Sequence, residues 1–171
     1  MRDFHWRGPW QCEPLQMVDV KFRLRQLELV REMRRTRLPT APVDVIGCDR
    51  LAEASAPDAI RRFQCLVALM LSSQTKDQVT ASAMDRLKAY AQDHLHRAHF
   101  DPETLRLASE DALAELLKPV GFYRIKARSL KRTGDILKAQ YQDDIPRTLE
   151  ELVQLPGVGP KMVMRGGWRV C

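Results

Sequence analysis

The sequence predicts an all-α fold, because apolar residues recur with helical spacing and no convincing segment alternates apolar and polar residues as a strand does. Proline, glycine and N-capping residues separate the periodic segments, so we expect about six to eight helices joined by short turns. With 171 residues, the chain is long enough for one domain with its own core.

The N-terminal part divides into three expected segments. Residues 1–17 are expected to form a disordered tail, and residues 18–38 an amphipathic helix. The arginines of this helix could form a nucleic-acid-binding face, although the solvated side of a packed helix is the favoured interpretation. Prolines and a glycine mark residues 39–57 as a linker.

Residues 58–163 are expected to form a helical domain. Asp58 is a candidate cap for its first helix, and Thr75 with Gln78 forms a candidate capping box for the next. We expect later helices to begin at Pro102, Ser109 and Tyr123. The last of these is long and basic, and five of its side chains could contact phosphates, with solvation as the favoured alternative: Arg124, Lys126, Arg128, Lys131 and Arg132.

The most informative segment is a glycine-containing turn at 155–163, with the sequence LPGVGPKMV. Thr148 and Glu151 form a capping box that marks a short helix just before it, and Pro160 suits the first position of a second helix. The segment 148–163 is therefore predicted to be a helix-hairpin-helix. Such a unit contacts the DNA backbone without reading base sequence.

The turn itself supplies the predicted DNA contacts. Gly157 and Gly159 have no Cβ and can both take positive φ, so their exposed N–H groups are expected to bind a phosphate, with Val158 between them. Lys161 follows in the first helical turn, where the helix N-terminus and partial burial would favour a neutral, nucleophilic amine. The alternative is a solvated lysine after an ordinary loop, because short glycine motifs have many false positives.

Two further segments occur in matching order and spacing, FQCLVALMLSSQTKD over 63–77 and VGFYRIKA over 120–127. Together with the hairpin, they resemble the endonuclease III family of DNA glycosylases, most closely its eukaryotic members, from about residue 60 to residue 162. The resemblance implies the helical-barrel half of that fold, truncated within the hairpin's second helix. It also implies base-excision repair by a bifunctional N-glycosylase for oxidised pyrimidines with abasic-site β-elimination lyase activity.

The resemblance implies residue roles as well. Lys161 would attack the sugar carbon and form a Schiff base, and Gln74 would fill the gap that a flipped nucleotide leaves in the duplex. Judged from the residues alone, Gln74 is a polar turn residue, and Asp77 is expected to stabilise a helix N-terminus rather than act as a base. The implied partner is double-stranded DNA with oxidised pyrimidines or abasic sites. The expected protein is a nuclear monomer, with the mitochondrion as a second location.

The family pattern continues with a catalytic aspartate and four closely spaced cysteines for an iron–sulfur cluster, whereas residues 164–171 form a divergent tail. We therefore expect no cofactor in this chain and an impaired glycosylase; a non-catalytic DNA-binding module and a non-functional isoform are the alternatives. Neither the four scattered cysteines nor the histidines at 94, 96 and 99 suggest a metal site. A formal charge of +6 fits a polyanionic partner, and no apolar run is long enough to span a membrane.

Overall fold

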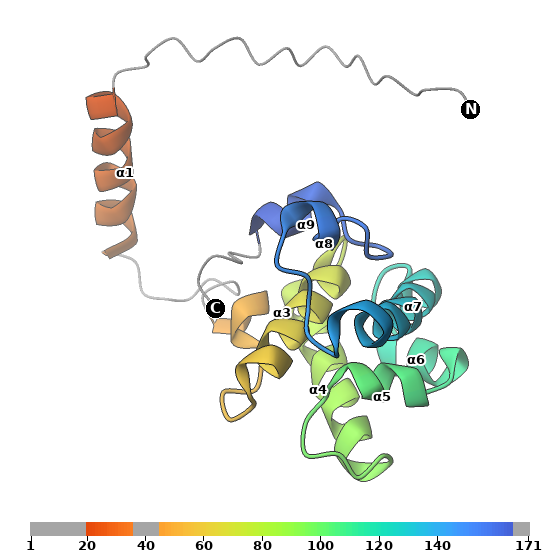
Figure 1. The fold of residues 1–171 in the computed structure, drawn as a ribbon. Helices are drawn as coiled ribbons and strands as arrows, with labels where there is room; N and C mark the ends of the chain where they lie inside the picture. The colour runs from red at the N-terminus through yellow and green to blue at the C-terminus, as the bar shows by residue number, and fades with distance from the viewer. Residues whose placement is uncertain (1–19, 36–44, 166–171) are drawn as a thin grey trace. The chain divides into compact units, whose positions relative to one another are not determined.

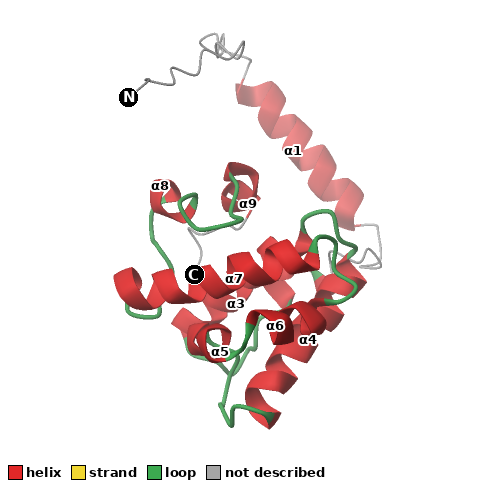
Figure 2. Cartoon of the chain, turned by 90° about the vertical axis from the view of Figure 1, so that its right-hand side faces the viewer, coloured by secondary structure: helices red, strands yellow, loops and turns green. Residues whose placement is uncertain are grey.

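The computed structural model describes residues 20–35 and 45–165, and its regular structure within these ranges is helical (Figures 1 and 2). The predicted all-α fold class is confirmed. The tail expected over 1–17 and the residues after 165 lie outside the described residues. The chain divides into two compact units, Met1–Thr40 and Ala41–Cys171.

The first unit contains helix α1 (Val20–Arg35), which is observed within the range expected for an amphipathic helix. Its described large apolar side chains are exposed: Phe22, Leu24, Leu27, Leu29, Val30 and Met33. Some of its charged side chains pair along the helix, as Arg25 does with Glu28. The helix is also not apolar enough to cross a membrane, and neither is any other described helix.

The second unit contains the remaining described helices, which follow one another along the chain in this order: η1 (Cys48–Arg50), α3 (Asp58–Ser72), α4 (Asp77–Asp93), α5 (Pro102–Leu107), α6 (Glu110–Leu117), α7 (Tyr123–Tyr141), α8 (Leu149–Leu152) and α9 (Pro160–Arg165). Helix α7 packs against α5 and α6, and α3 packs against η1, α4 and α7. Figure 2 shows α5 and α6 beside α7, with α8 and α9 together at one end of the unit.

The core of this unit forms around α3. Of its predicted apolar stripe, Phe63, Val67, Met70 and Leu71 are buried, and Ile60 is half-buried. The Phe63 ring packs against Phe100 with 5.3 Å between ring centroids. Gly134 lets α7 approach α5 closely, because a Cβ at this position would lie 3.1 Å from the Cβ of Leu105. The central helices are therefore held by close side-chain packing.

Of the three predicted caps, one is confirmed and two are wrong. Thr148 accepts a hydrogen bond from a backbone N–H group of α8, as predicted, and Asp101 and Ser109 cap α5 and α6 close to their predicted starts. The capping box of Thr75 and Gln78 is wrong, because α4 begins at Asp77 and the Thr75 hydroxyl donates to the Ser73 carbonyl instead. Likewise, Asp58 is the first residue of α3 and not its cap.

The segment expected to be a linker over 39–57 is described from residue 45, and there it contains η1 and packs against α3. Leu51 is buried, and the Gln64 side chain on α3 binds both the backbone N–H and the carboxylate of Glu53. His99 contacts the other oxygen of the same carboxylate at 2.6 Å. This network fixes the segment that contributes η1 to the wall of a cleft.

Helix α5 offers a direct test of this packing, because Leu105 is fully buried and Leu107 is 56% exposed. We expect Leu105→Ala to lower the free energy of unfolding by about 2 to 5 kcal/mol, since it leaves a cavity in the core. Leu107→Ala should change it by less than about 0.5 kcal/mol. Urea unfolding followed by circular dichroism measures both, and equal effects would contradict the described packing of α5.

Candidate active site

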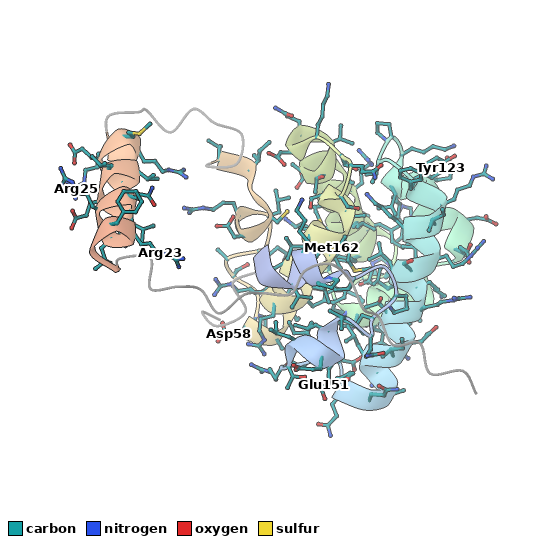
Figure 3. The ribbon with its side chains drawn as sticks, turned by 90° about the horizontal axis from the view of Figure 1, so that it is seen from above. Arg23, Arg25, Asp58, Tyr123, Glu151 and Met162 are labelled. Atoms are coloured by element: carbon teal, nitrogen blue, oxygen red, sulfur yellow. The ribbon has the colours of Figure 1, made fainter. Side chains whose placement is uncertain are left out.

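A cleft of about 760 Å³ brings residues from four parts of the second unit together. Its walls are the η1 region, the end of α3 with the turn that follows it, the start of α4, and the hairpin with α9. The described residues that line it are Gly47, Cys48, Asp49, Leu69, Ser72, Ser73, Gln74, Thr75, Asp77, Gly159, Lys161 and Met162. Three predicted site residues, Gln74, Gly159 and Lys161, thus share one cleft, and Figure 3 marks Met162 on its α9 wall.

The turn between α3 and α4 has the geometry of a type II β-turn. The N–H of Thr75 donates to the carbonyl of Ser72 at 3.2 Å, Ser73 has φ −62° and ψ 123°, and Gln74 has φ 52°. Glycine normally occupies the third position of such a turn, because other residues are strained there. The exposed Gln74 therefore occupies a conformation that its own backbone does not favour.

Two neighbouring residues hold this turn. Lys126 on α7 is buried, and its ammonium donates to the carbonyls of Leu71 and Ser73, each at 2.7 Å, and to the hydroxyl of Thr75 at 3.3 Å. Gly121 leaves room for the backbone, because a Cβ there would lie 2.9 Å from the Gln74 carbonyl oxygen. From the sequence we expected Lys126 to be solvated, and the structure shows instead that it caps α3.

Phe122 is a further candidate that sequence reasoning did not single out. It is 62% exposed, has φ 58°, and precedes the first residue of α7. It lines a smaller hollow of about 220 Å³ together with Gln74, Lys126 and Gly157. An exposed aromatic side chain on a strained backbone, next to a strained glutamine, makes Phe122 a candidate for the functional site. No pattern in the sequence indicates a positive φ at this phenylalanine.

The hairpin turn is a second type II turn, and its sequence suits that geometry. The N–H of Val158 donates to the Leu155 carbonyl at 3.1 Å, with Pro156 and Gly157 between them and φ 81° at Gly157. A Cβ on Gly157 would lie 3.2 Å from the Cβ and Oγ of Ser129 on α7. This glycine is therefore required by both conformation and space.

The other residues of the hairpin turn differ from Gly157 in their surroundings. Gly159 has no positive φ, and a Cβ there would meet nothing within 4 Å. The Val158 side chain is buried, and its N–H is used within the turn. Among the described residues, the N–H groups of Gly157, Gly159 and Lys161 have no protein acceptor. These three groups are thus available to a ligand, and Val158 offers no further donor.

Lys161 and Cys48 carry the amine and the thiol among the described residues of the cleft. Lys161 is exposed, so the partial burial expected from the sequence is not observed. Burial raises the pKa of the Cys48 thiol, and the carboxylates of Asp77 and Asp49 add to this effect, while a hydrogen bond with Ser72 opposes it. Cys48 is therefore held as a neutral thiol, which is a poor nucleophile.

Several basic residues are used inside the fold rather than on its surface. Lys131, on the same helix as Lys126, donates to the carbonyls of Arg106 and Ala108 at the end of α5. Arg86 on α4 does the same for the carbonyls of Leu116 and Lys118 at the end of α6. Each of these cations interacts favourably with the partial negative charge at a helix C-terminus. Lys126 and Lys131 are thus used within the fold, whereas Arg124, Arg128 and Arg132 of α7 are exposed.

In the described ranges, no group of three or more metal-binding side chains lies together. Cys48 and Cys65, the cysteines described, lie on η1 and α3 and do not form the closely spaced set of four that an iron–sulfur cluster needs. The described residues therefore do not fit such a cluster.

A family model described as "HhH-GPD superfamily base excision DNA repair protein" matches residues 67–165, more than half of the chain. The chain is 48% identical to Endonuclease III-like protein 1 of Gallus gallus over 137 residues, which make up 80% of this chain and 45% of that relative. It is 47% identical to the Mus musculus protein of the same name, with 80% and 42% covered. The chain thus spans less than half the length of these relatives.

A solved structure with the same arrangement of helices is that of a non-covalent Endonuclease III–DNA complex. It has a TM-score of 0.58 and 22% identity, over 84% of this chain and 55% of that one. At this identity, the likeness establishes the fold alone. The predicted helical-barrel architecture is therefore confirmed.

The two glycines of the hairpin should respond differently to the same substitution. Gly157→Ala forces a methyl group into strained backbone against Ser129, and we expect a loss of about 1 to 3 kcal/mol of stability. Gly159→Ala enters open space and should change stability by less than about 0.5 kcal/mol. Thermal or urea unfolding of both variants tests this difference. A larger loss for Gly159→Ala would contradict the described hairpin geometry.

Proposed function

The chain belongs to the HhH-GPD superfamily of base excision DNA repair proteins, and we propose that it acts on duplex DNA as a glycosylase for oxidised pyrimidines and an abasic-site lyase. The observation that carries this proposal is the cleft in which the amine of Lys161 faces the same space as Gln74 and Gly159. Its volume lies in the range of cavities that take a small ligand, which suits one nucleotide turned out of the duplex.

In the proposed reaction, the neutral amine of Lys161 attacks C1′ of the damaged nucleotide and displaces the base, which leaves with the bonding electron pair and takes up a proton. Loss of the amine proton and opening of the sugar ring give a Schiff base. Removal of a C2′ proton then expels the 3′ phosphate by β-elimination. At an abasic site, the amine instead condenses with the sugar aldehyde and releases water.

The cleft supplies two features that favour this chemistry. Asp49 and Asp77 place carboxylates along it, and negative charge stabilises the positive charge that develops on the sugar as the base leaves. Cys48 stays protonated, so it does not compete with the lysine amine. Asp77 can stabilise the N-terminus of α4, as expected from the sequence, and also contribute negative charge to the cleft.

We assign the DNA contacts to the hairpin and to Gln74 and Phe122, the two residues with strained backbone. Gln74 and Phe122 line the same small hollow and are both exposed, so we assign them to the space that an extruded nucleotide leaves in the duplex. The available N–H groups of Gly157, Gly159 and Lys161 would bind a backbone phosphate. The open space beside Gly159 would then be occupied by the DNA backbone.

DNA binding by the 171-residue chain should be independent of sequence and sensitive to salt, since the hairpin contacts only the backbone. For two or three phosphate contacts, raising monovalent salt from about 50 to about 200 mM should weaken binding about tenfold to fortyfold. Fluorescence anisotropy with duplexes of unrelated sequence measures both properties. Affinity that is unchanged by salt, or confined to one sequence, would exclude this mode of binding.

Chemistry at Lys161 is tested by trapping the imine. Sodium borohydride should link the wild-type chain covalently to abasic duplex DNA, and Lys161→Ala should abolish the link while binding persists. Lys138→Ala is the matched control, because it removes an exposed lysine that pairs with Asp143 away from the cleft. It should trap as the wild type does.

Each outcome of the trapping experiment is informative. If a folded wild-type chain binds abasic DNA but gives no covalent product, the chain is a binding module and the enzymatic proposal fails. If Lys161→Ala still traps, another amine reacts and the assignment of Lys161 is wrong. Release of oxidised pyrimidines is measured on the same duplexes by mass spectrometry of the free base.

A further inference from the structure

Lys126 is a buried cation that the proposed chemistry does not use. Its side chain comes from the first turn of α7, and only 9% of the residue is exposed. Burying an ammonium costs free energy unless its donors are satisfied, and here they bind the Leu71 carbonyl, the Ser73 carbonyl and the Thr75 hydroxyl. These three acceptors belong to the end of α3 and to the turn of residues 72–75.

The same turn presents Gln74 in a conformation that needs support. Its φ of 52° disfavours any residue with a Cβ, and the side chain is exposed, so no packing of Gln74 itself stabilises it. The Lys126 ammonium bonds the carbonyl just before Gln74 and the side chain just after it. Gly121 leaves room for the turn, because a Cβ there would lie 2.9 Å from the Gln74 carbonyl oxygen. The geometry of the turn is therefore imposed by α7 and the residue before Phe122.

We propose that Lys126 is a positioning residue, whose ammonium holds the turn so that Gln74 projects toward the gap in a distorted duplex. This inference rests on the proposed function, because it assumes that Gln74 enters that gap. Lys126 does not contact DNA in this role. Lys126 acts through the turn, because it fixes in the free protein the conformation that binding requires. This lowers the free-energy cost of ordering the Gln74 side chain when DNA binds.

The role predicts a pH dependence, because burial lowers the pKa of Lys126 from 10.5 to about 8. Below that pH, the ammonium has three donors for its three acceptors. As the pH rises through about 8, the amine loses a proton and keeps two donors, so the turn is held less firmly. No other described residue that lines the adjacent hollow is titratable. Cys48 hydrogen-bonds Ser72 of the turn, and burial raises the pKa of its thiol above 9.0, so it stays protonated while Lys126 loses its proton. The charged residues Lys76 and Asp77 follow the turn.

The experiment compares binding to a duplex that carries a tetrahydrofuran abasic analogue with binding to the intact duplex. This analogue cannot form an imine, so the ratio of the two affinities reports gap filling and not chemistry. Lys126→Met should lower the ratio about tenfold, the size expected for losing hydrogen bonds from a charged group. Gln74→Ala should lower it similarly, and the double variant should lose no more than either single variant.

Lys131→Met is the matched control. Lys131 lies on the same helix and also donates to two carbonyls at a helix end, but these belong to the end of α5 and not to the turn. Its loss should destabilise the fold as Lys126→Met does, while the binding ratio stays at the wild-type value. Circular dichroism and thermal unfolding establish that each variant is folded at the temperature used.

A second measurement needs no variant at position 126. In the wild type, the ratio of the two affinities should fall as the pH is raised from about 6.5 to about 9.5, with a midpoint near the pKa of Lys126. The fluorescence of 2-aminopurine placed opposite the abasic analogue should report the same change. In Gln74→Ala, the ratio should not vary with pH. The inference is overturned if the wild-type ratio is flat, or if Lys126→Met and Lys131→Met act alike. If the wild type binds the two duplexes equally well, both this inference and the proposed function fail.

Discussion

The hydrogen bonds from the Lys126 ammonium to the carbonyls at the end of α3 are the interaction on which the cleft depends. They join the first turn of α7 to the last turn of α3, and the carbonyl of Ser73 belongs at the same time to the turn that carries Gln74. A cation at a helix C-terminus is favourable, and burial strengthens each of its hydrogen bonds. The arrangement of core helices thereby fixes an exposed side chain.

Three basic side chains in this molecule close helix ends. Lys126, Lys131 and Arg86 each bind two carbonyls at the ends of α3, α5 and α6. These residues contribute to the formal charge of +6, but they do not face a nucleic acid. The net charge therefore overstates the basic surface of the described part of the chain. Its proposed sequence-independent contacts with DNA come from backbone N–H groups of the hairpin, and exposed basic side chains account for the expected salt dependence.

The two turns of the site show what the sequence could predict and what it could not. Pro156 and Gly157 are the residues that a type II turn favours, so the hairpin and its exposed donors could be located from local chemistry. Ser73 and Gln74 form the same kind of turn without a glycine, because Lys126, far along the chain, and Gly121 impose it. The spacing of apolar residues predicted helices α3 to α9, because a helix depends on residues close to one another in the sequence. The strained backbone at Gln74 and Phe122 depends on residues that are distant in the sequence, so it could not be predicted.

One face of α7 relates the two turns to each other. Lys126 and Ser129 are spaced by three residues, which places them on the same side of the helix, and Phe122 directly precedes it. Lys126 holds the turn that contains Gln74. Ser129 lies beside Gly157 in the hairpin, which leads to Gly159 and Lys161 in the cleft wall. The turn that carries Gln74 and the hairpin that leads to Lys161 are thus held by residues less than one turn apart on a single helix. A rigid spacer of this kind suits an enzyme that must open a duplex and reach the exposed sugar at the same time.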